Sequence, residues 1–480
     1  MNFTSNYYKW FEKIILFITQ IFIACAAMAS IYVFSSSFTG MMKYFVLGIT
    51  ALTYILVVSF FRDSIKEMLN KLLSLFGKLE VWKMLLIISA TLALGRLVCS
   101  LFFGFDASVD GDISIYCNIA GMLVQGTKPD MVISHLYGMG VHIAVFELLH
   151  IHLTVGTFIA VLIATLVNFI SFKELFGKEK AFFVTMFYVL MPSTSLFTMC
   201  PTHEIFVYLY ISVFIFSLNR FLKENNRWMM IAYIALCSVC TALCTFVNPS
   251  GYMLYIIMLL VIVLSSADRL KKLLIVVMIV LSFLGNGFVS SGMDEDQYTT
   301  KMNTYNILIH GVNPESLGEQ IDMYPEHQVK QYLYNHNMEI NHENSLYGAN
   351  KVLINHYIYL LKNPAVLFKL IVHKFYILYS GVHYPINLAN HYGAFNGPVY
   401  FVILAINTLM YLFMITVGLV YGEKKNRNLL VNNYHLALLG NLGVTMLCIV
   451  VNKYSVYVTM FIYFICMYRS CLGESEDADE

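Results

Sequence analysis

Three carboxylates stand within one short segment, and they are the side chains best suited to chemistry in this chain. Asp106, Asp110 and Asp112 occur in the sequence FDASVDGD, directly after an apolar stretch that ends near Phe103. A carboxylate beside a membrane can accept a proton from a hydroxyl nucleophile. A group of carboxylates can also bind a divalent cation such as Mg²⁺ or Mn²⁺. In a purely structural interpretation, Asp112 only satisfies free N–H groups in the N-terminal turn of the helix that follows and complements the helix dipole.

The residues after Asp112 favour a helix that carries other polar groups on the same side. Tyr116 and Ala120 follow Asp112 at intervals of four, and Gly126 comes later. Residues spaced by four lie on one face of a helix, so Asp112 and Tyr116 are expected to face the same way. Tyr116 is therefore a candidate substrate-binding residue beside the candidate base.

A second polar element follows two prolines, Pro192 and Pro201, in a predicted turn between apolar stretches. It contains Thr202, His203 and Glu204. One interpretation gives Glu204 a catalytic role and His203 a contact with substrate. The other makes this turn a helix start, with Thr202 as the N-cap and Glu204 in the first turn.

Four further polar residues next to apolar segments are candidates for substrate binding, and each also has a structural interpretation. Asn248 begins the tight turn Asn248-Pro249-Ser250-Gly251, for which a structural role is the favoured interpretation. Asn313 belongs to the sequence IHGVNPESLGEQID, whose Gly, Asn and Pro residues demand a defined turn. His373 and Lys374 either contact a lipid phosphate or form a snorkelling pair at the membrane surface.

Composition decides the broad class of the protein. Of the 480 residues, 59% are hydrophobic and only 12% are charged, whereas soluble domains carry about 25% charged residues. Repeated apolar stretches of about 20 residues predict an all-α polytopic membrane protein with about 12 to 13 transmembrane helices. No basic stripe of the kind that binds nucleic acid is visible. The predicted spans are 14–34, 44–61, 84–104, 154–172, 181–199, 204–219, 229–247, 251–266, 273–290, 399–421, 434–451 and 455–469.

The positions of the basic residues predict the orientation. Short loops rich in Lys and Arg, such as 62–83 and 220–227, fall on one side, and this side is expected to be the cytoplasm. Both termini would then be cytoplasmic, and the segments 105–153 and 291–398 would face outward. The short apolar segments 139–149 and 367–379 either cross the membrane or lie at its surface, and the orientation rule favours the surface.

The sequence thus divides into four expected regions. These are an N-terminal hairpin with its basic loop, a transmembrane core that contains the first outer loop, a large outer region, and C-terminal helices with an acidic tail. Their boundaries are 1–83, 84–290 with loop 105–153, 291–398 and 399–480.

Taken in order, these motifs resemble the GT-C class of membrane glycosyltransferases, particularly bacterial relatives of the protein O-mannosyltransferase and aminoarabinose transferase families. The resemblance rests on the Asp112 segment, the turn before Glu204, the Asn248-Pro249 turn and the Asn313 segment. Pro364 followed by Lys374 adds to it, and together the motifs cover most of residues 84–390.

The resemblance implies an enzyme of the bacterial plasma membrane that acts at its outer face. The donor would be a polyprenyl-phosphate sugar, and the acceptor an extracytoplasmic glycan, a teichoic acid or a lipid-linked saccharide. Asp112 would be the general base, with Asp110 as the alternative. Asp106 and Glu204 would support the site, or Asp106, Asp110 and Asp112 would hold a divalent cation. Lys374 would contact the lipid phosphate, and no other cofactor is implied.

Three other functions remain as alternatives. A transporter or flippase of lipid-linked saccharides needs a polar path across the membrane, but Arg96 is the clearest ionisable residue within an apolar span. A polysaccharide polymerase is expected to carry arginines in its outer loops, and arginine is scarce there. A non-enzymatic scaffold explains the hydrophobicity but not the ordered polar turns.

Overall fold

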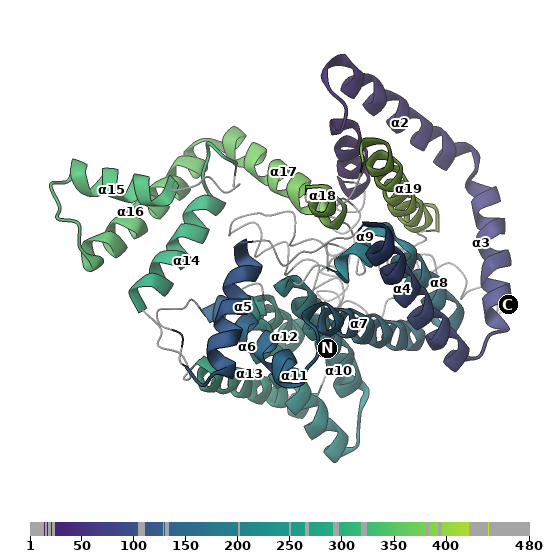
Figure 1. Cartoon of the computed structure of the whole chain (residues 1–480), viewed down its shortest axis with the longest axis horizontal. Helices are drawn as coiled ribbons and strands as arrows, with labels where there is room; N and C mark the ends of the chain where they lie inside the picture. Colours follow the sequence, from purple (N-terminus) through teal and green to yellow (C-terminus); the bar gives the residue numbers. More distant parts are fainter. Residues whose placement is uncertain are drawn as a thin grey trace, which may run out of the picture.

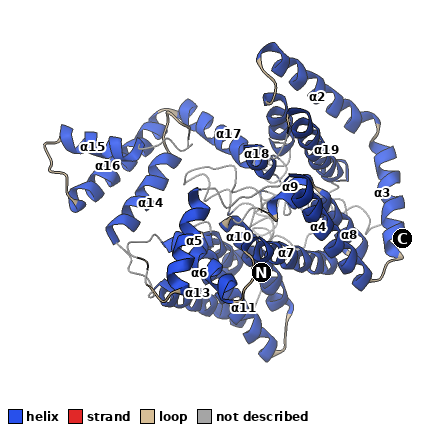
Figure 2. Cartoon of the chain, viewed as in Figure 1, coloured by secondary structure: helices blue, strands red, loops and turns tan. Residues whose placement is uncertain are grey.

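The computed structural model is helical throughout the part of the chain that it describes, with no strand among those residues (Figure 1). Figure 2 shows the same arrangement with helices and loops distinguished. The described residues are 14, 17, 21, 25–103, 111–127, 129, 134–199, 202–248, 251–264, 268–290, 297–317, 324–380, 384–391, 396–421 and 440. The prediction of an all-α polytopic membrane protein is confirmed.

Seven helices in this part are long and apolar enough to cross a membrane. They are α2 (Gly40–Phe60), α4 (Val81–Phe103), α7 (Leu153–Phe176), α10 (His203–Lys223), α11 (Arg227–Val247), α13 (Arg269–Ser290) and α19 (Gly397–Tyr421). Four shorter apolar helices accompany them: Cys25–Ser36, α5 (Gly111–Val124), α6 (Ser134–Leu148) and α12 (Tyr252–Leu264). The predicted spans 434–451 and 455–469 lie outside the described residues, apart from Gly440.

The remaining helices are more polar or shorter. They are α3 (Arg62–Gly77), α8 (Lys178–Leu190), α9 (Pro192–Phe197), α14 (Gln297–Gly311), α15 (Tyr324–Asn335), α16 (His342–Lys362), α17 (Pro364–Ser380) and α18 (Tyr384–His391).

Helix α10 lies at the centre of the bundle, packed between α7 and α11. In the most apolar 18-residue stretch of α10, 72% of the residues are buried, whereas none are buried in the corresponding stretch of α2. Asn168 of α7 donates hydrogen bonds to Tyr208 and Ser212 of α10, at 3.2 and 2.9 Å. Hydrogen bonds between membrane helices contribute about 0.6 kcal/mol each on average. These two bonds therefore fix the relative position of α7 and α10, while packing supplies most of the stability of the interface.

The predicted span 181–199 is two helices in the structure. Helix α8 ends at Leu190, Met191 takes an extended conformation with ψ of 131°, and α9 begins at Pro192. Proline lacks an N–H and disfavours a helical conformation in the residue before it, so the break falls where the sequence places Pro192.

The two short apolar segments that were expected either to cross the membrane or to lie at its surface each form part of a separate helix. Segment 139–149 lies largely in α6, whose 15 residues extend about 22 Å. Segment 367–379 lies in α17, whose 17 residues extend about 25 Å. Both are shorter than the hydrocarbon layer of about 30 Å.

Helices α14, α15 and α16 form a small unit with its own hydrophobic core, which we call the α14–α16 subdomain. Ile309, Val329, Leu333 and Val352 lie in this core, separate from the core of the main bundle. Figure 1 shows the subdomain at one end of the molecule, with α17 leading back toward α18 and α9. None of its three helices is among the candidate membrane spans of the described chain.

Candidate functional site

Glycines bring α5, α6 and α11 close together and so fix the position of α5. A Cβ atom added to Gly138 would lie 2.3 Å from the backbone oxygen of Phe246. One added to Gly140 would lie 2.3 Å from Cγ2 of Ile119. Because neither space admits a methyl group, the two glycines allow α6 to pack directly against α11 on one side and α5 on the other.

This packing places a buried polar chain between α5 and α10. The hydroxyl of Tyr116 lies 3.2 Å from Nδ1 of His203. Nε2 of His203 lies 2.9 Å from a carboxylate oxygen of Glu204. Tyr116, His203 and Glu204 are only 2%, 5% and 1% exposed, so water does not screen these contacts. The structure therefore joins three of the residues that the sequence singled out.

Two neighbours hold the His203 ring in place. The hydrogen bond between Nδ1 and the hydroxyl of Tyr116 runs in a direction set by the tautomer of the ring. Nε2 lies close to the carboxylate of Glu204, the next residue of α10. His203 thus orients the hydroxyl of Tyr116.

The start of α10 differs from the predicted helix cap. Thr202 occupies the N-cap position, but its side chain makes no capping hydrogen bond. Its hydroxyl is buried without a hydrogen-bond partner in the described part of the chain. The expectation that Thr202 caps α10 is therefore wrong for its side chain, although Glu204 does lie in the first turn. An unsatisfied buried hydroxyl is costly, which makes this a place where a ligand oxygen would be stabilised.

Asp112 is the second residue of α5, one helical turn before Tyr116. Nothing is described of its side chain, and Asp106 and Asp110 lie outside the described residues. The possible cation site at these three aspartates is thus untested. Among the described residues, no group of three His, Cys, Asp or Glu side chains is arranged to hold a metal.

Asn248 and Asn313 both lie in turns. Asn248 ends α11, and its backbone oxygen accepts a hydrogen bond from the N–H of Gly251 at 2.9 Å. The side-chain oxygen of Asn313 accepts a hydrogen bond from the N–H of Glu315, also at 2.9 Å. The Asn313 arrangement is the turn that its Gly, Asn and Pro neighbours predict. Both side chains are buried.

His373 and Lys374 lie on α17 and differ sharply in exposure. Lys374 is completely buried, while His373 is partly exposed and its ring lies 6.0 Å from that of Tyr376. A snorkelling lysine extends its ammonium group into water. The burial of Lys374 excludes that arrangement for this residue.

Arg96 has structural partners within the bundle. Its Nη1 donates a hydrogen bond of 2.8 Å to the backbone oxygen of Thr198, just after α9. Its guanidinium lies 5.4 Å from the ring centre of Phe158. The clearest ionisable residue in an apolar span therefore satisfies a carbonyl exposed by the broken helix.

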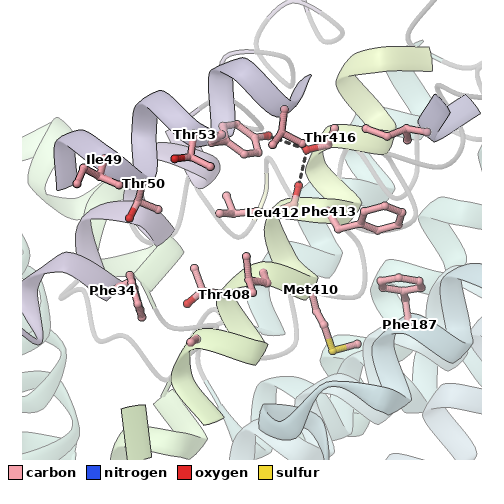
Figure 3. Close-up of a pocket in the computed structure, with 15 residues that line it drawn as sticks. Phe34, Ile49, Thr50, Thr53, Phe187, Thr408, Met410, Leu412, Phe413 and Thr416 are labelled. Atoms are coloured by element: carbon pink, nitrogen blue, oxygen red, sulfur yellow. Dashed lines mark hydrogen bonds between the residues drawn. The ribbon is translucent and has the colours of Figure 1, made fainter. Parts of the chain in front are cut away.

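A separate apolar cavity lies between α2 and α19 (Figure 3). Its volume is about 620 Å³, and its lining includes Phe34, Leu412 and Phe413. Thr416 donates a hydrogen bond of 3.1 Å to the hydroxyl of Tyr54 at one side of it. Such a lining suits an apolar chain, and it shares no residue with the Tyr116 cluster.

Comparison with known proteins gives limited likeness. No protein-family model matches the chain, and no curated protein matches it. Among solved structures, it is similar to the archaeal oligosaccharyltransferase AglB from Archaeoglobus fulgidus, solved with an inhibitory peptide and a dolichol-phosphate. The identity is 10% and the TM-score 0.36, over 79% of this chain and 49% of that one. The chain thus spans about half the length of that protein, and a TM-score this low does not establish a shared fold.

The contact between His142 and Tyr210 was not predicted from the sequence. His142 of α6 contacts the backbone oxygen of Gly138 at 2.7 Å through Nδ1, and its Nε2 contacts the hydroxyl of Tyr210 on α10. Tyr210 lies seven residues, or about two turns, after His203, so α10 holds both α5 and α6 through one face. A histidine within the apolar sequence of α6 was the available signal.

Proposed function

We propose that this chain is a membrane glycosyltransferase that moves a sugar from a polyprenyl-phosphate donor to an extracytoplasmic acceptor, either a glycan, a teichoic acid or a lipid-linked saccharide. Asp112 is the general base. It takes the proton of an acceptor hydroxyl while that oxygen attacks the anomeric carbon of the donor. The bond from this carbon to the phosphate oxygen breaks, the polyprenyl phosphate leaves, and the configuration of the sugar is inverted.

One observation supports this proposal more than any other. A buried chain of Tyr116, His203 and Glu204 begins one helical turn after Asp112, in a protein whose interior is otherwise mostly apolar. Buried polar networks are costly unless every member is satisfied, so a chain of this kind requires a purpose. Orientation of the acceptor beside Asp112 is the purpose that we propose.

The other candidate residues divide between donor and acceptor. Lys374 and His373 contact the donor phosphate, where positive charge stabilises the leaving group. The buried hydroxyl of Thr202 and the N-terminal amides of α10 are further donors for a phosphate oxygen. Asp106 and Asp110 assist Asp112, either by hydrogen bonds or by holding a divalent cation.

The bonds of Arg96 disfavour the rival transport function. An ion-coupled carrier needs ionisable groups that are accessible from a path through the membrane. Arg96 instead bonds the carbonyl of Thr198 and lies against Phe158. Its role is then to stabilise the break between α8 and α10.

The test is sugar transfer by the purified protein in nanodiscs, from polyprenyl-phosphate hexoses to membrane-derived glycans. We expect Asp112→Asn to lower the rate by about 10²–10⁴-fold, the usual contribution of a general base. Asp63→Asn is the matched control, because Asp63 is also a first-turn carboxylate, in α3. Wild-type activity in a folded Asp112→Asn protein would remove Asp112 from the mechanism.

A further inference from the structure

The α14–α16 subdomain contains a cavity of about 420 Å³ that no step of the proposed reaction uses. Ligand pockets commonly have volumes of about 300–1,000 Å³. One face of α14 lines it with Tyr298, Asn303 and Asn306, and one face of α15 lines it with Glu326 and Lys330. The cavity therefore has room for a small ligand and polar groups from two helices.

The two kinds of lining separate within the cavity. Met302, Val329 and Leu333 belong to the hydrophobic core of the subdomain and form an apolar part of the wall. Asn303 and Asn306 supply amides, each of which can donate and accept hydrogen bonds. An apolar wall beside convergent amides matches a sugar ring, which has C–H faces and hydroxyl edges.

Asn306 provides the most specific sign that a ligand is bound here. Its side-chain oxygen is buried and has no hydrogen-bond partner in the described part of the chain. Buried polar atoms in native proteins are nearly always paired, so an orphan at a cavity wall calls for a partner from outside. A hydroxyl group of a ligand would satisfy it.

The charges at the cavity favour a neutral ligand. Among the described residues that line it, Glu326 and Lys330 are the charged ones, and they have opposite signs. A site for phosphate or another anion would carry an excess of positive charge. The ring of Tyr298 stacks on that of His342 at 3.9 Å with an angle of 9° between the planes, which adds a rigid aromatic surface.

We propose that this cavity binds a neutral oligosaccharide, as an acceptor-binding site of the α14–α16 subdomain. The acceptor role rests on the proposed glycosyltransferase function, whereas binding itself does not. A chain held here by the α14–α16 subdomain would present its growing end to the reaction site for repeated use.

Binding can be measured without any donor. The full-length protein in nanodiscs is applied to an array of neutral oligosaccharides of two to four hexose or N-acetylhexosamine units, with polyol phosphates and short peptides alongside. The dissociation constant is then measured for the best-bound neutral oligosaccharide. We expect Asn306→Leu to weaken that binding about tenfold, the value of one hydrogen bond.

Asn350→Leu is the matched control, because Asn350 is an exposed asparagine of α16 outside the cavity. It should bind as the wild type does. Asn306→Leu removes an unsatisfied acceptor, so its unfolding temperature should not fall, and a loss of binding then reports on the cavity and not on folding.

Each outcome decides between the two proposals. Binding to peptides or polyol phosphates alone, or equal binding by Asn306→Leu and wild type, would overturn the oligosaccharide site. Sugar transfer with an unchanged acceptor KM in Asn306→Leu would reject the site and leave the enzyme. Glycan binding that Asn306→Leu weakens, without transfer from any donor, would reject the enzyme and leave the site.

Discussion

The hydroxyl of Tyr116 reaches Nδ1 of His203 across 87 residues of sequence, and this bond of 3.2 Å connects α5 to the start of α10. Helix α5, whose second residue is Asp112, is thus held to α10, which has the largest buried share among the seven candidate membrane spans of the described chain. A movement of α5 would break a hydrogen bond between two buried groups, so the position of its first turn is restrained.

Tyr116→Phe should loosen this restraint while keeping the ring. The variant removes the hydrogen bond between the hydroxyl and Nδ1 of His203, and we expect a loss of about 1 kcal/mol in the free energy of unfolding. Sugar transfer should fall about tenfold, because an active site is sensitive to small displacements of its groups. Both are measured on protein in nanodiscs, by chemical unfolding and by the transfer assay.

Tyr137→Phe is the control for that variant. It removes a tyrosine hydroxyl from α6, the partner of α5 in the same helical pair. The described part of the chain shows no hydrogen bond for this hydroxyl, and the ring of Tyr137 lies 5.9 Å from that of Phe246. An equal loss of activity in the two variants would mean that the bond to His203 has no special role.

The glycines of the α5–α6 pair should respond to alanine in opposite directions. Gly138→Ala places a methyl group 2.3 Å from the backbone oxygen of Phe246, and overpacking of this kind typically costs about 1–3 kcal/mol. Gly121→Ala meets no atom within 4 Å, so the better helix propensity of alanine should stabilise α5 by up to about 1 kcal/mol. Thermal unfolding of both variants measures the difference, and the same sign for both would refute close packing of α6 on α11.

The sequence predicted the local features of the site because they depend on spacing and residue type. The helix through Asp112 and Tyr116 follows from intervals of four, and the turn at Asn313 follows from its neighbours. The break at Met191 was not predicted, because 181–199 was expected to be one span, although Pro192 was the available signal. Each of these depends on residues a few positions apart.

The contacts between helices were not predictable in the same way. The pairing of Tyr116 with His203, and of His142 with Tyr210, depends on how α5 and α6 pack on α10. That packing is set by where two glycines meet Phe246 and Ile119, and no periodicity encodes it. The burial of Lys374 likewise comes from the placement of α17 and not from its own apolar sequence.

The α14–α16 subdomain should become less stable in mild acid through His356. Burial lowers the pKa of His356, and the charge of Glu315 opposes this shift only in part. The unfolded chain then binds a proton near the usual histidine pKa of about 6.5, before the folded protein does. Stability is therefore unaffected above that value and falls as the pH drops from it toward the lower pKa of the folded state.

This dependence is measured as the unfolding temperature at a series of pH values. His356→Gln cannot be protonated and should show a smaller decrease below pH of about 6.5. His327→Gln, at an exposed position of α15, should keep the wild-type decrease. A wild-type decrease that persists in His356→Gln would assign the effect to another group.

The orientation of the chain can be tested by cysteine labelling in intact cells. Three variants each place a thiol at an exposed position: Asn118→Cys on α5, Asn335→Cys on α15 and Asn225→Cys between α10 and α11. In a background without other cysteines, we expect a membrane-impermeant maleimide to label the first two in intact cells. Asn225→Cys should react only after the cells are opened, since its neighbours Lys223 and Arg227 favour the cytoplasm.

Sidedness matters because the proposed acceptor and the base must meet in one compartment. The first-turn carboxylate of α5 and the cavity of the α14–α16 subdomain belong to two segments that the distribution of basic residues assigns to the same side. Labelling of Asn118→Cys and Asn335→Cys under different conditions would put them on opposite sides of the membrane. A glycan bound at Asn306 could then not offer its hydroxyl to Asp112, and the coupling of the two sites would fail even if each bound its ligand.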